Sequence, residues 1–273
     1  MRRFFILTIA AAAALVISML FGQLLGGFYI YNLVVEDNPS VLELSEVNPQ
    51  TSLVKRKVLR LQPIDFYTIQ AGIFQEASSA QASIDKLVSL GLRPYVTPEP
   101  PFKIWVGCFG DMASGKDLED RLKNQGFEVF IGKGLINDRA LKFPGEDEYM
   151  INYFAPLLGK YDIILSHSMK MFQSPNVTVF KPDVWENMIK KVQIELNEGI
   201  SEVDKVLNRQ ESFNYQSELL KLEEKTQAYE KGLNIIKGSK SNEAVINSQG
   251  QLLELIAAYH NLISKTNKKL NLN

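Results

Sequence analysis

Aromatic rings and hydrogen-bonding groups alternate with apolar residues between positions 66 and 131. Alternation of this kind is the signal of a β-strand, in which every second side chain shares a face. One such face collects Thr68, Gln70, Tyr95, Lys103, Trp105 and Phe130. Aromatic rings stack on the apolar faces of a ligand, while amide, hydroxyl and ammonium groups bond to its rim. The set predicts a binding surface for a flat ligand whose edge carries hydroxyl or amide groups.

These side chains lie in a segment that occurs twice in the chain. Residues 67–96 align without a gap with residues 102–131, at an offset of about 35 residues. The identical pairs are Ile69 and Ile104, Gly72 and Gly107, Phe74 and Phe109, Ser79 and Ser114, Asp85 and Asp120, Leu87 and Leu122, and Gly91 and Gly126. A repeat of this length indicates two supersecondary units in tandem.

Each copy predicts a strand, a helix and a second strand. Residues 67–72 and 102–107 alternate with period two, and apolar residues then follow with helical spacing. Gly91 and Gly126 stand where the C-cap of a helix favours a left-handed residue. Two such units give βαββαβ, the ferredoxin-like or RNP-like α+β arrangement, in which two helices cover one face of the sheet and the other face is free.

The alternation also assigns side chains to the two faces of this sheet. The residues expected to point at the helices are Tyr67, Ile69, Ala71, Phe102, Ile104 and Val106. Phe66, Thr68, Gln70, Lys103 and Trp105 then point away, together with Tyr95 and Phe130 on the outer strands. The alternative is that helices from the C-terminal half cover this second face and turn it into another core.

The two repeat strands carry a family resemblance. The first reads Tyr67-Thr-Ile-Gln-Ala-Gly-Ile-Phe74 and the second Phe102-Lys-Ile-Trp-Val-Gly-Cys-Phe109. With the tandem repeat, they resemble the SPOR domain over residues 64–134. The resemblance implies a bacterial domain that binds peptidoglycan, typically glycan strands stripped of their stem peptides, in cell division or sporulation. Gln70 matches the family's glutamine and Lys103 stands where the family commonly has arginine, whereas Trp105 and Cys108 depart from the usual residues.

An apolar run over residues 4–35 follows Met1-Arg2-Arg3 and is long enough to cross a bilayer. The arginines before it and the acidic residues after it place the N-terminus in the cytoplasm and the remainder outside. The sequence therefore predicts a transmembrane signal anchor over residues 1–35, giving a single-pass protein of the cell membrane. A cleaved signal peptide is the alternative, because it begins with the same basic end.

The rest of the chain divides into a linker and a helical domain. Residues 36–63 show no sustained period of apolar residues and contain three prolines, which predicts a linker. Residues 146–273 predict a C-terminal all-α bundle: a helix over 146–172, one long helix or two in line over 182–236, and a last helix over 245–263. No family resemblance marks this half, and a protein partner is a further expectation for its helices.

Composition argues against several function classes. The chain has 273 residues, a formal net charge of −1 and one cysteine, which disfavours a nucleic-acid partner and leaves no intramolecular disulfide. His167 and His260 fall in separate predicted helices without carboxylates at ligand spacing, so no metal or cofactor site is predicted. Phosphate loops and nucleophile elbows are missing. We expect a protein that is not an enzyme, although any two carboxylates can meet in a fold.

Three functions follow from these observations. The first is a membrane-anchored protein that displays a glycan-binding domain, with rings of Trp105, Tyr95 or Phe130 stacking on sugars and with Gln70 and Lys103 donating hydrogen bonds. The second is a membrane scaffold whose sheet and helices bind proteins. The third is an RNA-binding module of the same fold, against which the neutral charge and the export signal argue.

Overall fold

The computed structural model describes residues 56–61, 64–136, 140–173, 182–239 and 241–270. The chain divides into two compact units, of which one contains strand β1 (Arg56–Arg60) with Lys142–Glu146 and the other contains Leu61–Leu141 with Asp147–Asn273. The predicted anchor over residues 1–35 lies outside the described residues. Within the described part of the chain, no helix is both long and apolar enough to cross a membrane.

Strand β1 lies inside the segment that the sequence predicts as a linker. It pairs with β6 (Ala140–Pro144) in a two-stranded sheet. Its partner is about 80 residues away in the chain, so no local period reveals the pairing. The other described residue of the predicted linker is Leu61, and residues 36–55 and 62–63 lie outside the described residues.

The repeat folds as an α+β domain with the predicted order of elements. Its strands and helices are β2 (Ile64–Phe74), α2 (Ala77–Ser89), β3 (Tyr95–Val96), β4 (Phe102–Phe109), α3 (Lys116–Asn124) and β5 (Phe130–Ile136). The strands form one antiparallel sheet in the order β3-β4-β2-β5. The two central strands therefore come from equivalent positions of the two copies.

The first core lies between this sheet and helices α2 and α3. Ile69 and Ile104, an identical pair of the repeat, are both fully buried there. Leu87 from α2 and Leu122 from α3, another identical pair, pack in the same cluster. These contacts confirm which face of the sheet points at its own helices.

Both helices of the repeat end with the same cap. Gly91 has a φ of 76° and Gly126 a φ of 83°, a region that other residues rarely adopt. In each copy the glycine N–H donates to the carbonyl three residues back, and the next residue donates to the leucine of the identical pair: Leu92 to Leu87 at 3.2 Å and Phe127 to Leu122 at 3.1 Å. This is the Schellman pattern, and it confirms the predicted caps.

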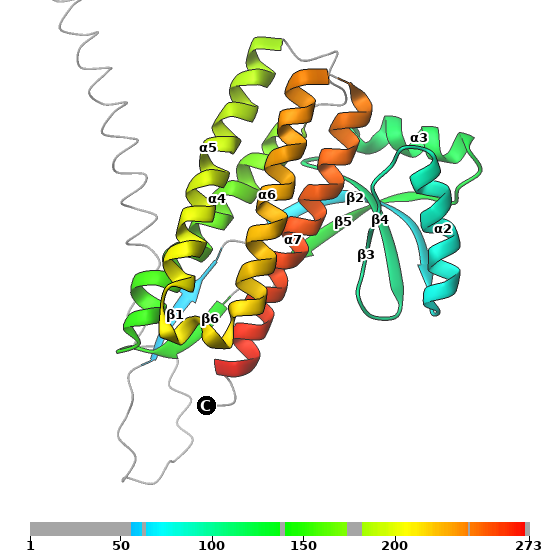
Figure 1. Cartoon of the computed structure of the whole chain (residues 1–273). Coiled ribbons are helices and arrows are strands. Elements are labelled where there is room, and N and C mark those ends of the chain that lie inside the picture. Colours follow the sequence, from blue (N-terminus) through cyan, green and yellow to red (C-terminus); the bar gives the residue numbers. More distant parts are fainter. Residues whose placement is uncertain (1–55, 62–63, 137–139, 174–181, 240, 271–273) are drawn as a thin grey trace, which may run out of the picture. The chain divides into compact units, whose positions relative to one another are not determined.

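The C-terminal half is a bundle of antiparallel helices, as predicted (Figure 1). Its helices are α4 (Ala155–Met171), α5 (Pro182–Leu207), α6 (Gln216–Ser239) and α7 (Asn242–Leu270). A π-helical segment over Met150–Phe154 precedes α4. Pro156 explains this irregular start, because proline has no N–H to donate to the α-helical ladder.

The alternatives of one long helix or two helices in line over residues 182–236 are both wrong. A short 3-10 segment over Gln210–Asn214 reverses the chain, and α5 and α6 lie side by side. Gln193 donates from Nε2 to Oδ1 of Asn234 at 2.8 Å across the pair. The apolar spacing of three and four continues on both sides of the reversal, and for this reason the pattern alone resembles one helix.

Candidate functional site

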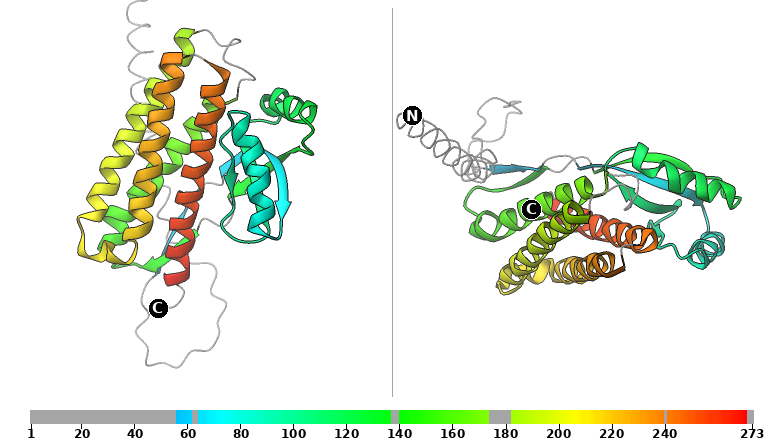
Figure 2. Two further views of the ribbon diagram at one scale, coloured as in Figure 1. Left: turned by 45° about the vertical axis from the view of Figure 1, so that its right-hand side comes forward. Right: turned by 90° about the horizontal axis from the view of Figure 1, so that it is seen from above.

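The bundle packs against the sheet face that α2 and α3 leave free. Helix α7 lies along β4 and contacts β3, while α4 contacts β2 (Figures 1 and 2). At their junction the Sγ atom of Cys108 on β4 lies 3.6 Å from the Sδ atom of Met169 on α4. Phe66, Thr68 and Cys108 are 2%, 3% and 0% exposed. This half of the face is a second core, which is the alternative that the sequence left open.

Thr68 belongs to the covered half. It points to the predicted face, but its hydroxyl donates to the carbonyl oxygen of Gly107 at 2.8 Å beneath the bundle. A buried hydroxyl needs such a partner, since leaving it unpaired costs about 1 to 3 kcal/mol. The prediction that Thr68 is accessible to a ligand is wrong for this structure.

Four of the other five predicted residues form one row across the sheet. Tyr95 on β3 is the cross-strand neighbour of Trp105 on β4, and Trp105 is the neighbour of Gln70 on β2. Gln70 is in turn the neighbour of Phe130 on β5. The row therefore crosses all four strands of the sheet, and neighbours in it are about 5 Å apart. Phe130 is 54% exposed, and the other members are half-buried.

Trp105 is held between two other rings. Its ring centroid lies 5.8 Å from that of Tyr95 with the planes tilted by 35°, and 6.3 Å from that of Phe66 in an edge-to-face contact. Offset and edge-to-face geometries are the favourable ones for aromatic pairs. Trp105 is therefore oriented by the protein itself and needs little ordering when a ligand stacks on it.

Lys103 lies two residue pairs beyond this row, opposite Ile73. Its backbone N–H donates to Oγ1 of Thr97 at 2.8 Å, which ties β4 to the segment after β3. Lys103 is half-buried and Ile73 is 52% exposed. We name the residues Gln70, Ile73, Tyr95, Lys103, Trp105 and Phe130 the open face.

A bulge in each central strand explains why Ile73 and Cys108 share this face. The pairing of β2 with β4 slips by one residue next to Gly72 and again next to Gly107. The extra residue in each copy reverses the alternation, so that Phe74 and Phe109 return to the first core. A ring occupies the place of the missing side chain in both copies: a Cβ atom on Gly72 would lie 2.4 Å from Phe74, and one on Gly107 would lie 2.7 Å from Phe109.

Repeat symmetry makes Cys108 and Ile73 a matched pair for a labelling experiment. Burial raises the pKa of the Cys108 thiol, and the side chain has no exposed surface. We expect a maleimide to label Cys108 at least about 100-fold more slowly than an Ile73→Cys thiol made in a Cys108→Ala chain, because Cys108 must wait for an opening reaction. Equal rates, measured by mass spectrometry under native conditions, would show that the bundle does not cover this half.

An ion cluster joins α7 to the end of the row at β3. The Nε atom of Arg93 lies 2.8 Å from Oε1 of Glu254, and the Nζ atom of Lys225 on α6 lies 3.2 Å from its Oε2. Burial works to raise the pKa of Glu254, but the hydrogen bonds and charges of Arg93 and Lys225 outweigh it and hold that pKa below its usual range. Burial, and secondarily the charge of Glu254, raises the pKa of Tyr95.

The cluster predicts a pH-dependent contribution to stability. A carboxyl whose pKa is lower in the folded state stabilises the fold above its unfolded pKa, about 4.3, and loses this effect as the pH falls through the folded value. Glu254→Gln should lower the free energy of unfolding at pH 7 by about 1 kcal/mol and have less effect as the pH falls below about 4.

Glu224→Gln is the control, because the exposed Glu224 also pairs with Lys225, at 2.9 Å. It should change the free energy of unfolding by less than about 0.5 kcal/mol. Denaturant titrations at several pH values measure both variants. Equal effects at pH 7 would contradict a specific role for Glu254.

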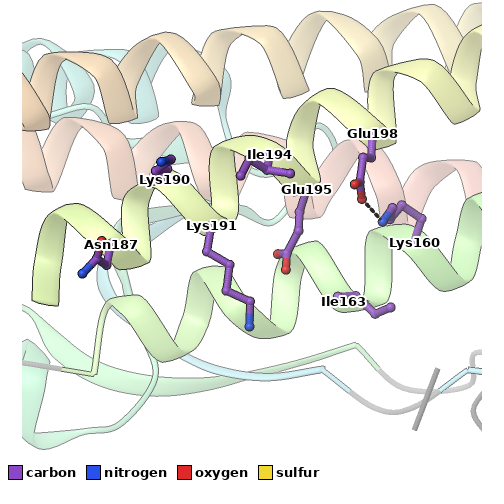
Figure 3. Close-up of a pocket in the computed structure, with 8 residues that line it drawn as sticks. All are labelled: Lys160, Ile163, Asn187, Lys190, Lys191, Ile194, Glu195 and Glu198. Atoms are coloured by element: carbon purple, nitrogen blue, oxygen red, sulfur yellow. Dashed lines mark hydrogen bonds and ion pairs between the residues drawn. The ribbon is translucent and has the colours of Figure 1, made fainter. Parts of the chain in front are cut away.

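A groove between α4 and α5 is a second place where charged groups gather (Figure 3). It has a volume of about 380 Å³ and is lined by Lys160, Ile163, Asn187, Lys190, Lys191, Ile194, Glu195 and Glu198. Beside it the Nδ1 atom of His167 lies 2.7 Å from Oε1 of Glu195, and Lys160 pairs with Glu198. His167 thus has a carboxylate partner on α5 and joins two helices. The described residues include no group of three His, Cys, Asp or Glu placed to hold a metal ion.

The sequence reasoning left the covered half of the sheet as an alternative and missed the ion cluster. One signal for the first exists in α7, where buried residues come in adjacent pairs such as Leu252 with Leu253 and Leu262 with Ile263. A helix that packs on one side shows a single apolar stripe, whereas adjacent pairs indicate two packed sides. The ion cluster has no sequence signal, because Arg93 and Glu254 are far apart in the chain.

Comparison of the chain with protein-family models, with curated proteins and with solved structures found no match.

Proposed function

We propose that this chain is a membrane-anchored SPOR-domain protein that binds peptidoglycan glycan strands, stripped of stem peptides, outside the cytoplasmic membrane. The proposal places residues 1–35 in the membrane as a single-pass anchor and gives the protein a part in cell division or sporulation. It assigns no enzymatic activity, cofactor or nucleic-acid partner to the chain.

The row from Tyr95 through Trp105 and Gln70 to Phe130 is the observation that carries the proposal. Sugar rings present apolar faces that stack on aromatic side chains and hydroxyl groups that bond to amides. The row combines these functions, with rings on β3, β4 and β5 and the amide of Gln70 on β2. Stripped strands suit the open face better than intact ones, because stem peptides on both sides of a strand need room that the adjoining bundle occupies.

Sedimentation of the full chain in detergent with purified wall sacculi tests the proposal. We expect more protein to pellet after an amidase has removed the stem peptides, and we expect Gln70→Ala to lower this amount several-fold. Gln75→Ala, an exposed residue just beyond β2, is the control and should pellet like the wild type. Failure of stripped sacculi to pellet the wild-type protein would exclude the glycan function.

A scaffold function is the second candidate, and the covered half of the sheet favours it. Phe66, Thr68 and Cys108 are already buried, and Cys108 lies against a helix of the same chain. If the sheet is mainly a docking surface for helices, Trp105→Ala and Phe130→Ala would weaken binding of a protein partner and leave sedimentation with sacculi unchanged. The sedimentation experiment therefore separates the two candidates.

A further inference from the structure

Lys103 carries a positive charge on the open face that no described carboxylate pairs with. It stands between Phe102 and Ile104, which pack in the first core, so its side chain points to the other face of β4. The side chain is half-buried. An ammonium group that has lost part of its hydration without gaining a carboxylate partner is well suited to bind an anionic group of a ligand.

The other cations beside the open face are compensated. Arg93, just before β3, lies on the same face as Lys103, but Glu254 binds its guanidinium group. Glu254 also binds Lys225, which pairs in addition with Glu224. This cluster therefore holds two cations and two carboxylates, and its charges cancel. Among the described residues of the face, the uncompensated positive charge is that of Lys103.

Two acidic residues lie near the open face along the chain. Glu99 is in the loop between β3 and β4, and Glu128 is two residues before Phe130. Both are exposed, and in the described structure neither pairs with Lys103. Exposed charges that do not pair interact through water and are screened by salt, so these carboxylates leave most of the positive potential at Lys103.

The backbone holds Lys103 at a defined place relative to the row. Its N–H donates to Oγ1 of Thr97 at 2.8 Å, and its carbonyl oxygen accepts from the N–H of Thr97 at 3.1 Å. Lys103 and Trp105 are two residues apart on one strand, so their Cα atoms are about 6.5 Å apart. A lysine side chain can cross this spacing and reach a substituent at the edge of a sugar that stacks on Trp105.

We infer that Lys103 selects for the carboxylate that loss of a stem peptide leaves on the glycan, an inference that rests on the proposed function. An amide bond joins the stem peptide to its sugar. Hydrolysis of that bond with one water molecule leaves a carboxylate on the glycan and an amine on the released peptide. A stripped strand therefore offers Lys103 a negative charge at a place where an intact strand carries a neutral amide.

Glycan fragments of equal length and different charge test this inference. Soluble stripped fragments are used as such and after carbodiimide coupling to ammonia, which converts their carboxylates into primary amides. The coupling restores the neutral state of an intact strand without the bulk of a peptide. The affinity of the full chain in detergent is measured for both forms. We expect the untreated fragments to bind about three- to tenfold more tightly at low salt, and this ratio to fall as salt is added.

Three variants assign the preference to Lys103. Lys103→Gln should bring the ratio of the two affinities close to one, because a glutamine side chain can donate a hydrogen bond to an amide and to a carboxylate alike. Lys103→Arg should keep the wild-type ratio, because the positive charge remains. Lys86→Gln removes an exposed lysine from α2, a helix on the other face of the sheet, and should also keep the wild-type ratio.

Two kinds of result would overturn the inference, and they differ in what they leave standing. If the wild-type chain binds amidated and untreated fragments equally well, or if Lys103→Gln keeps the wild-type ratio, Lys103 does not select for the carboxylate and the proposed glycan function stands. If neither form of the fragments binds, the proposed function and the inference fall together.

Discussion

Replacing Trp105 with alanine is expected to weaken binding of stripped glycan fragments at least about tenfold, which corresponds to about 1.4 kcal/mol. The central position of Trp105 in the row is the reason, since its ring has Tyr95 on one side and Gln70 as its cross-strand neighbour on the other. Well-ordered tryptophans at the centre of a contact are the residues whose truncation costs most. The affinity of the full chain for soluble fragments measures this effect.

Two further variants separate loss of stacking from loss of folding. Trp105→Phe keeps a ring between Tyr95 and Phe66 and should lose only about two- to threefold in affinity. Trp185→Phe changes the other tryptophan of the chain, which is buried against Phe172, and should leave the affinity unchanged. If Trp105→Ala and Trp185→Phe lose the same affinity, the loss comes from a disturbed fold and not from the missing contact of the Trp105 ring with the ligand.

Gly107→Ala is expected to lower the free energy of unfolding by about 2 to 5 kcal/mol, a larger loss of stability than Glu254→Gln should cause. Gly107 has a φ of 70°, and a side chain in this left-handed region costs about 1 to 2 kcal/mol. The new Cβ atom would also lie 2.7 Å from the ring of Phe109 and 3.3 Å from Leu118. Overpacking of a core adds about 1 to 3 kcal/mol.

Gly126→Ala is the matched control for this change. Gly126 has a φ of 83°, but a Cβ atom on it has no neighbour within 4 Å. It should therefore show the conformational cost alone, about 1 to 2 kcal/mol. Chemical denaturation of the two variants measures the difference. If the two variants are equally stable, the ring of Phe109 yields to the methyl group, and the bulge does not need glycine for packing.

The repeat made much of the first domain predictable. Identical residues at equivalent places of the two copies meet the same conformational need. Gly91 and Gly126, for example, both adopt a positive φ and cap helices in the same way. Alternation along the strands likewise placed Ile69 and Ile104 in the first core. These features depend on neighbours in the chain, which local patterns record.

Contacts between distant segments were not predictable in the same way. The bulges at Gly72 and Gly107 change the alternation through the pairing of two strands, and the covering of Thr68 depends on a bundle whose helices lie far along the chain. The row itself was predicted as a set of residues on one face. Its order across the strands required the register of the sheet, which the turn geometry and the bulges determine.

The fluorescence of Trp105 tests most directly whether the open face binds glycan. In a Trp185→Phe chain, Trp105 is the remaining tryptophan, because the sequence contains two. We expect its emission to change as stripped glycan fragments are added and to saturate at the concentration at which binding saturates. Emission that stays constant while the protein still binds the fragments would contradict the account, because the glycan would then be held elsewhere on the chain.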